Sequence, residues 1–147
     1  SNENRAAVYA LLLDELEAAA GPDKAAEIMK RAIYKRGEQI GERFGQYAPG
    51  DFEGLRDAFV GGIPDQGRMF APEVVSCNAD GLVVEFSNCP LKNAWRKMGL
   101  SEARCAKLCG IARVVDNGTF ESAGFDFEVR SLPEGEERCS LVVRPRK

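Results

Sequence analysis

Histidine is absent from the sequence, which excludes catalytic triads with an imidazole base and metal sites that need a histidine ligand. No apolar run reaches the ~18–20 residues that a membrane-spanning helix requires. The first five residues include an acid and lead into no signal-peptide core, so we expect no secretory signal and a cytoplasmic protein.

Clustered basic residues are also scarce. The net charge is −3, and the only basic group is a short tail of Arg144, Arg146 and Lys147. Nucleic-acid binders need many Lys and Arg side chains against phosphates, so neither a nucleic acid nor a membrane is an expected partner. With 147 residues and 44% hydrophobic content, the chain is expected to form one globular domain.

Residues 1–62 have the apolar periodicity of helices. A first helix is expected to end at Gly21, and Pro22 is suited to the opening turn of a second helix that continues to Tyr47. Asp51 is a candidate N-cap for a third helix, which Gly61 and Gly62 would close.

Three glycines, Gly37, Gly41 and Gly45, recur at four-residue spacing and form a smooth ridge on the second helix. Each glycine costs about 1 kcal/mol of helix propensity relative to alanine, so we expect another structural element, a ligand or a second subunit to pack closely against them. One alternative is a packed helix or sheet of the same chain. The other is a groove for a ligand or for an identical subunit, as in a homodimer.

From residue 73 onward the period changes to that of strands. Strands are expected at 73–77, 82–87, 125–132 and 139–144, and turn-forming residues join them into two hairpins. Short helices at 90–98 and 102–115 lie between the hairpins, and Ser101 is a candidate cap for the second of them. Locally paired strands around a helical pair predict an α+β fold with a four-stranded antiparallel sheet. Residues 63–71 are expected to form a loop.

Five cysteines make up the most unusual part of the composition. Their odd number, without a secretory signal, argues against a disulfide framework and predicts free thiols. Cys89 directly precedes Pro90, so its sulfur is expected near helix N-terminal amides, which stabilise a thiolate. This geometry suits a nucleophile, and a buried structural cysteine is the alternative.

Cys105 and Cys109 are four residues apart and therefore lie on one helical face. They are either small hydrophobic core residues or ligands of a zinc ion, which Cys89 and Cys139 could complete. No cofactor is required by these patterns, and zinc held by cysteines is the alternative.

The region from residue 85 to residue 141 resembles the 2-aminothiazoline-4-carboxylate hydrolase family. The family pattern has a cysteine before a short helix, a second cysteine further along, and a glycine ahead of a third. Here Cys89, Cys109, Gly135 and Cys139 match in type, order and spacing. The supporting features are Phe86-Ser-Asn-Cys89-Pro90, Trp95, Gly99, Leu108-Cys109 and Leu132-Pro-Glu-Gly135-Glu-Glu-Arg-Cys139-Ser-Leu.

The resemblance implies ring opening of a small cyclic substrate at a carbon between sulfur and nitrogen, which gives an N-carbamoyl-cysteine. Such chemistry needs an activated water or a covalent nucleophile, together with a proton donor. Where the family usually has an acid shortly after its second cysteine, this chain has Ala112, and Asp116 is the candidate substitute. The implied catalytic residues are thus Cys89, Cys109 and Asp116. The implied substrate-binding residues are Arg113, Arg96, Trp95 and Cys139.

Two functions are therefore considered. One is a hydrolase acting on a cyclic C–N substrate. The other is a non-enzymatic binding or sensor domain, because the order of helices and hairpins also resembles the 4-vinyl-reductase superfamily, whose members enclose small ligands. Both hypotheses predict that Cys89, Cys109 and Cys139 converge, since the helix with Cys109 lies between the two hairpins.

Overall fold

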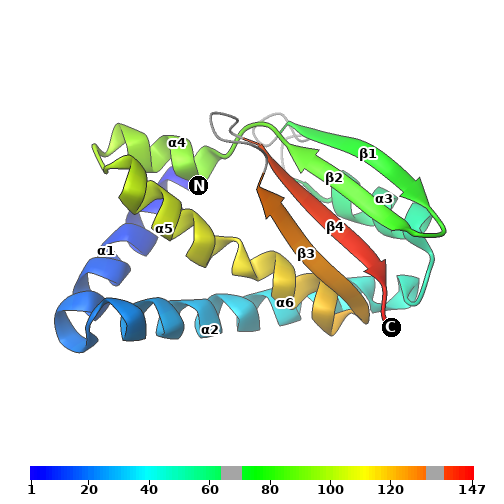
Figure 1. The fold of residues 1–147 in the computed structure, drawn as a ribbon, viewed down its shortest axis with the longest axis horizontal. Helices are drawn as coiled ribbons and strands as arrows, with labels where there is room; N and C mark the ends of the chain where they lie inside the picture. Colours follow the sequence, from blue (N-terminus) through cyan, green and yellow to red (C-terminus); the bar gives the residue numbers. More distant parts are fainter. Residues whose placement is uncertain (64–70, 132–137) are drawn as a thin grey trace.

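The computed structural model describes residues 1–63, 71–131 and 138–147. It begins with two long helices, α1 (Asn2–Ala20) and α2 (Pro22–Gly41), which reverse direction at Gly21 (Figure 1). Gly21 has a φ of 85°, a conformation that glycine adopts without strain. The predicted extension of the second helix to Tyr47 is wrong, because the chain tightens at Gly41 into a 3₁₀ helix, η1 (Glu42–Tyr47).

The next elements are α3 (Phe52–Gly61), β1 (Pro72–Asn78) and β2 (Gly81–Phe86). The predicted N-cap is confirmed, since the Asp51 carboxylate accepts a hydrogen bond from the Gly54 N–H at 3.0 Å. Within the expected loop at 63–71, residues 64–70 lie outside the described residues.

Three helices follow the first hairpin: α4 (Pro90–Lys97), α5 (Glu102–Ala112) and α6 (Val114–Ser122). Ser101 caps α5 as expected, accepting from the Arg104 N–H at 3.1 Å. The single helix predicted at 102–115 is wrong. The chain bends at Arg113, whose carbonyl accepts from the Asp116 N–H at 3.0 Å, and a further helix begins there.

The last two strands, β3 (Phe125–Ser131) and β4 (Cys139–Pro145), complete a sheet of order β1-β2-β4-β3. All three pairings are antiparallel, with Phe86 opposite Cys139 and Val129 opposite Leu141. The expected α+β class and its two hairpins are confirmed. Residues 132–137, which include the turn of the second hairpin, lie outside the described part of the chain.

Side chains are buried in two clusters. The first, here called the helical core, contains residues from α1, α2, α4 and α5, including Leu13, Trp95 and Leu108. The second, the sheet core, packs one face of the sheet against η1, α3 and α6 around Phe120 and Phe125. The helix cluster and the sheet therefore meet along α6.

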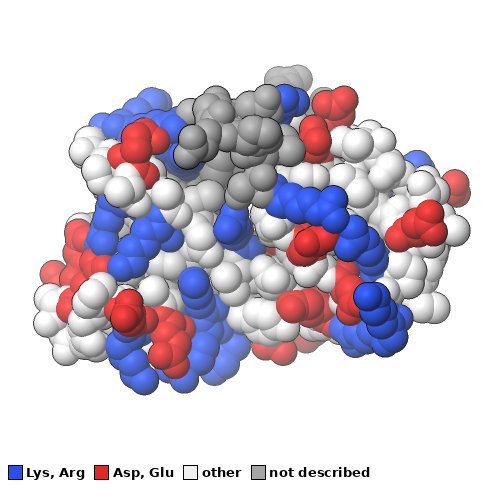
Figure 2. Space-filling view, viewed as in Figure 1, with Lys and Arg blue, Asp and Glu red and all other residues white. Residues whose placement is uncertain are grey.

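The other face of the sheet is charged. Figure 2 shows Lys, Arg, Asp and Glu side chains gathered over the strands on the viewed side. Glu128 pairs with Arg130 at 2.8 Å and with Arg144 at 2.9 Å. Beneath these long side chains Ser140 and Val142 are buried, because the stems of arginines and glutamates cover the central strand.

The glycine ridge of α2 is filled by α6 of the same chain. A Cβ added at Gly37 would lie 2.9 Å from the Cα of Gly118 and would overlap the backbone oxygen of Val115. Gly41 is equally close to Thr119, whereas a Cβ at Gly45 would only meet Ala123 at 4.0 Å. The packed-helix alternative is thus confirmed at Gly37 and Gly41, and a second subunit does not occupy these two positions.

Gly37→Ala is expected to destabilise the protein by about 1–3 kcal/mol or more, because the added methyl group must displace the α6 backbone. Gly45→Ala is the matched control, since its Cβ has room, and we expect little change in stability. Denaturant unfolding of both variants measures the difference in free energy. Equal midpoints for the two variants would show that α2 and α6 can separate without cost.

No helix among the described residues combines the length and apolar character needed to cross a membrane.

Candidate functional site

Cys89 lies where the first hairpin leads into α4. It is the N-cap residue, and its carbonyl accepts from the Asn93 N–H at 3.0 Å, while its side chain makes no capping hydrogen bond. The residue is half-buried and packs against the helical core. The backbone of Cys89 therefore forms the start of α4, as the sequence predicts.

Cys109 and Cys105 both project from α5, but into different surroundings. Cys105 is fully buried, and its thiol lies 3.9 Å from the Leu100 carbonyl oxygen. Burial raises the pKa of the Cys105 thiol, which is the behaviour of a small core side chain. Cys109, one turn later, is half-buried at the edge of the same core.

Cys139 is the first residue of β4, and strand register brings it to Cys89. It pairs with Phe86, the last residue of β2, and Cys89 follows three residues later. Side chains alternate along a strand, so Cys139 shares its face with the buried Leu141 and Val143. The sulfur of Cys139 consequently lies on the side of the sheet that the helices cover.

The structure brings Cys89, Cys109 and Cys139 within electrostatic reach of one another. Burial raises the pKa of Cys109, and a charge on Cys89 raises it further. Burial likewise raises the pKa of Cys139 to about 11, with added repulsion from Cys109, Asp116 and Cys89. We call these three thiols together with Asp116 the thiol cluster. At neutral pH the Cys109 and Cys139 thiols are held in the protonated form.

Asp116 joins the cluster from the first turn of α6. The residue is half-buried, and desolvation raises the pKa of its carboxyl group to about 7. The guanidinium of Arg5 acts in the opposite direction. Ala112, which stands where an acid was expected, is buried in the helical core. The bend at Arg113 is what turns Asp116 toward Cys139.

The other predicted site residues divide into two groups. Arg113 belongs to the cluster, because its charge lowers the pKa of both Cys109 and Cys139 against the larger effect of burial. Arg96 instead binds Glu102 through two hydrogen bonds, at 2.9 and 3.1 Å. Trp95 is fully buried in the helical core, and its ring N–H donates to the Ala6 carbonyl at 2.8 Å.

Sequence reasoning missed two charged residues at this site, Arg5 and Lys92. Arg5 comes from the N-terminal helix, and no sequence signal relates it to Asp116. Lys92 is three residues after Cys89, a spacing that places both on one side of α4 and could have identified it.

All five cysteines are free thiols, as expected. Among residues 1–63, 71–131 and 138–147, no group of three or more cysteine, aspartate or glutamate side chains is arranged to hold a metal ion. The zinc alternative through Cys89, Cys105, Cys109 and Cys139 therefore finds no support in these residues.

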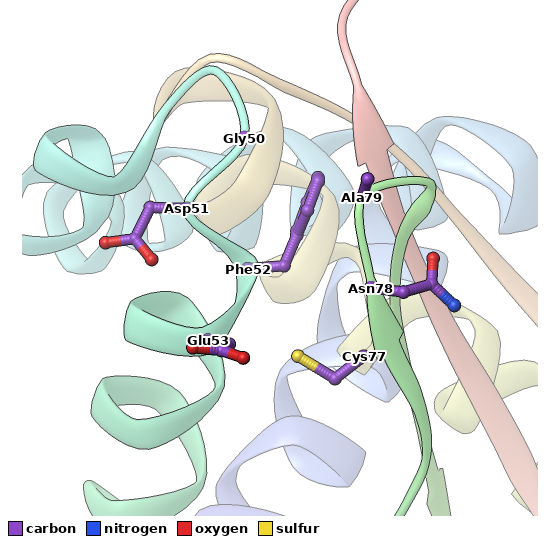
Figure 3. Close-up of a pocket in the computed structure, with 7 residues that line it drawn as sticks. All are labelled: Gly50, Asp51, Phe52, Glu53, Cys77, Asn78 and Ala79. Atoms are coloured by element: carbon purple, nitrogen blue, oxygen red, sulfur yellow. The ribbon is translucent and has the colours of Figure 1, made fainter.

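A hollow on the surface lies away from the thiol cluster, between α3 and the first hairpin. It has a volume of about 280 Å³. Figure 3 shows the Cys77 sulfur pointing toward Glu53 across it, with the Phe52 ring beside them. Cys77 packs against the sheet core, so this thiol is separate from the other four, which belong to or pack near the helical core and β4.

Comparison with known proteins places the chain in context. The family model described as L-2-amino-thiazoline-4-carboxylic acid hydrolase matches residues 1–142. The phenol-responsive sensory domain of the transcription activator PoxR, crystallised with phenol, has a similar structure, with a TM-score of 0.57 and 16% sequence identity. The match covers 99% of this chain and 74% of that one. At this identity the likeness shows a shared fold alone. No curated protein matches the chain.

The family match covers residues 1–142, so the resemblance predicted for residues 85–141 extends over the N-terminal helices as well. Gly135 and its neighbours at 132–137 lie outside the described residues. The helical half was missed because its amphipathic pattern is common to many folds and contains few distinctive residues.

Proposed function

Because the chain belongs to the L-2-amino-thiazoline-4-carboxylic acid hydrolase family, we propose that it opens the ring of a small thiazoline carboxylate at the thiol cluster. The observation that carries this proposal is the position of Asp116. A carboxyl group with a pKa of about 7, whose charge reaches the Cys139 thiol, can both accept and donate a proton at neutral pH.

Cys89 is the proposed nucleophile. It stands at the N-cap of α4, whereas burial keeps the Cys109 and Cys139 thiols protonated. Its sulfur attacks the ring carbon between sulfur and nitrogen. The bond from that carbon to the ring sulfur breaks, and the ring sulfur takes the proton that Cys89 gives up.

Water then completes the reaction. Its oxygen adds to the same carbon, the bond to the Cys89 sulfur breaks, and Cys89 regains a proton. The sum is one water consumed and one N-carbamoyl-cysteine formed. Asp116 is suited to carry the proton in both steps, and Arg113 to hold the substrate carboxylate.

The direct test is incubation of the protein with 2-amino-thiazoline-4-carboxylate and detection of N-carbamoyl-cysteine by mass spectrometry. We expect catalytic turnover by the wild-type protein and equal turnover by Cys77→Ser, since Cys77 lines the hollow away from the thiol cluster. Absence of product with enzyme and substrate at equal concentration would refute the hydrolase proposal.

A second candidate function is binding without turnover, and the protonated state of two of the thiols favours it. Burial keeps the Cys109 and Cys139 thiols neutral, so these two side chains suit contact with a small neutral molecule. The shared fold with a phenol-responsive domain is consistent with this candidate. Calorimetric titration with phenol distinguishes the two: saturable binding together with no thiazoline turnover would favour the sensor.

A further inference from the structure

Lys92 occupies the first turn of α4, directly after the Cys89 cap. The third residue after a cap lies on the same side of the helix as the cap itself. Lys92 is half-buried, so part of its side chain packs against the protein.

The neighbouring cations on α4 and α5 are engaged by acids. Glu102 binds Arg96 at 2.9 Å, and Glu17 binds Lys107 at 2.9 Å. At the far end of α4, Lys97 pairs with Glu3 at 3.5 Å. Lys92 differs, since it forms no hydrogen bond or ion pair with any residue that the structure describes.

The charge of Lys92 nevertheless reaches the thiol cluster. Burial and the neighbouring Cys89 raise the pKa of Cys109, while Arg113 and Lys92 act against them. Lys92 also helps to lower the pKa of Glu102, after the larger effects of the Arg96 pair. Two cations from different helices, Lys92 on α4 and Arg113 at the end of α5, thus flank Cys109.

Lys92 has no ion-pair partner among the described residues, so its ammonium group can pair with an anionic ligand without giving up a bond to the protein. In a thiazoline-4-carboxylate the carboxylate is separated from the reacting carbon by only the ring nitrogen and one further carbon. A cation one helical turn from Cys89 is therefore well placed to hold the carboxylate while the sulfur reaches that carbon.

We propose that Lys92 is the specificity-determining residue of the site and selects ligands that have a carboxylate next to the ring. This inference rests on the proposed ring-opening function and names a residue for it beyond the cysteines, Asp116 and Arg113.

The test compares Lys92→Met with Lys92→Arg and with the control Lys97→Met, which removes a 75% exposed lysine from the same helix. Each variant is assayed with 2-amino-thiazoline-4-carboxylate and with its neutral carboxamide. For Lys92→Met we expect KM for the carboxylate to rise about ten- to a hundredfold, the loss typical of a hydrogen bond to a charged group. KM for the carboxamide and kcat should change little. Lys92→Arg should restore most of the affinity, and Lys97→Met should match the wild type.

An unchanged KM for the carboxylate in Lys92→Met, or an equal rise for carboxylate and carboxamide, would overturn the inference. Failure of the hydrolase proposal is recognised separately, as no turnover by the wild-type protein. In that case, calorimetric titration with 2-amino-thiazoline-4-carboxylate tests whether Lys92 binds the carboxylate group. Weaker binding by Lys92→Met than by Lys97→Met supports the inference, and equal binding, or no binding by the wild type, refutes it.

Discussion

Cys89→Ser is expected to reduce thiazoline ring opening by at least about a thousandfold, the loss typical when a nucleophile is removed. A serine hydroxyl at the N-terminus of α4 stays protonated at neutral pH and is a far weaker nucleophile than a thiolate. The fold should not suffer. Serine is among the preferred N-cap residues, and the Cys89 side chain makes no capping hydrogen bond that could be lost.

Steady-state rates, thermal unfolding and intact-protein mass spectrometry check this prediction together. Wild-type protein mixed rapidly with substrate should show the mass of a covalent adduct, and Cys89→Ser should not. Cys77→Ser, at the surface hollow, is the matched control and should behave as wild type. Parallel losses of activity and melting temperature in Cys89→Ser would instead assign Cys89 a packing role.

Asp116→Asn is expected to stabilise the protein at pH 8 and to have little effect on its stability at pH 4. The pKa of the carboxyl group is raised in the folded state from 3.8 to about 7, first by burial. The wild-type fold must therefore hold a desolvated carboxylate above pH 7, and its stability falls as the pH rises from about 4 through 7. Asparagine removes this cost, which is at most about 4 kcal/mol.

The same substitution should abolish most of the ring-opening activity, since asparagine cannot transfer a proton. Residual activity should lose the inflection near neutral pH that Asp116 gives the wild-type rate profile. Asp57→Asn is the control, because its carboxylate is 71% exposed and binds only at the surface to Arg56. If Asp116→Asn lowered stability equally at pH 4 and pH 8, the carboxyl group would be a structural hydrogen-bond acceptor and not a poised acid.

A gain in stability together with a loss of activity in Asp116→Asn would indicate that Asp116 serves function at the expense of stability. Residues that serve catalysis are often held in surroundings that disfavour them in the resting protein. Asp116 in its desolvated position and Lys92 without an ion pair among the described residues have this character. Glu17 has the opposite character, because its surroundings stabilise the charged carboxylate. Hydrogen bonds from Arg104 and Lys107 lower the pKa of Glu17 to about 2 and join α1 to α5.

The sequence by itself determined the features that depend on neighbours along the chain. Strand alternation and turn residues located both hairpins, and the caps at Asp51 and Ser101 are formed as predicted. The odd number of cysteines indicated free thiols, and the helical spacing of Cys105 and Cys109 placed them on one element. These features follow from backbone conformation and local hydrogen bonding, which a few adjacent residues decide.

Only the tertiary structure decided how these parts function together. Most of helix α6 was not predicted, because residues beyond Val115 include the weak helix former Gly118, and the helix packs against the glycines of α2. Asp116 lies in the first turn of this helix, from which its charge reaches Cys139. Contacts between distant parts of the chain leave no periodic pattern in the sequence. The thiol cluster therefore becomes visible only when the sheet and α6 are assembled.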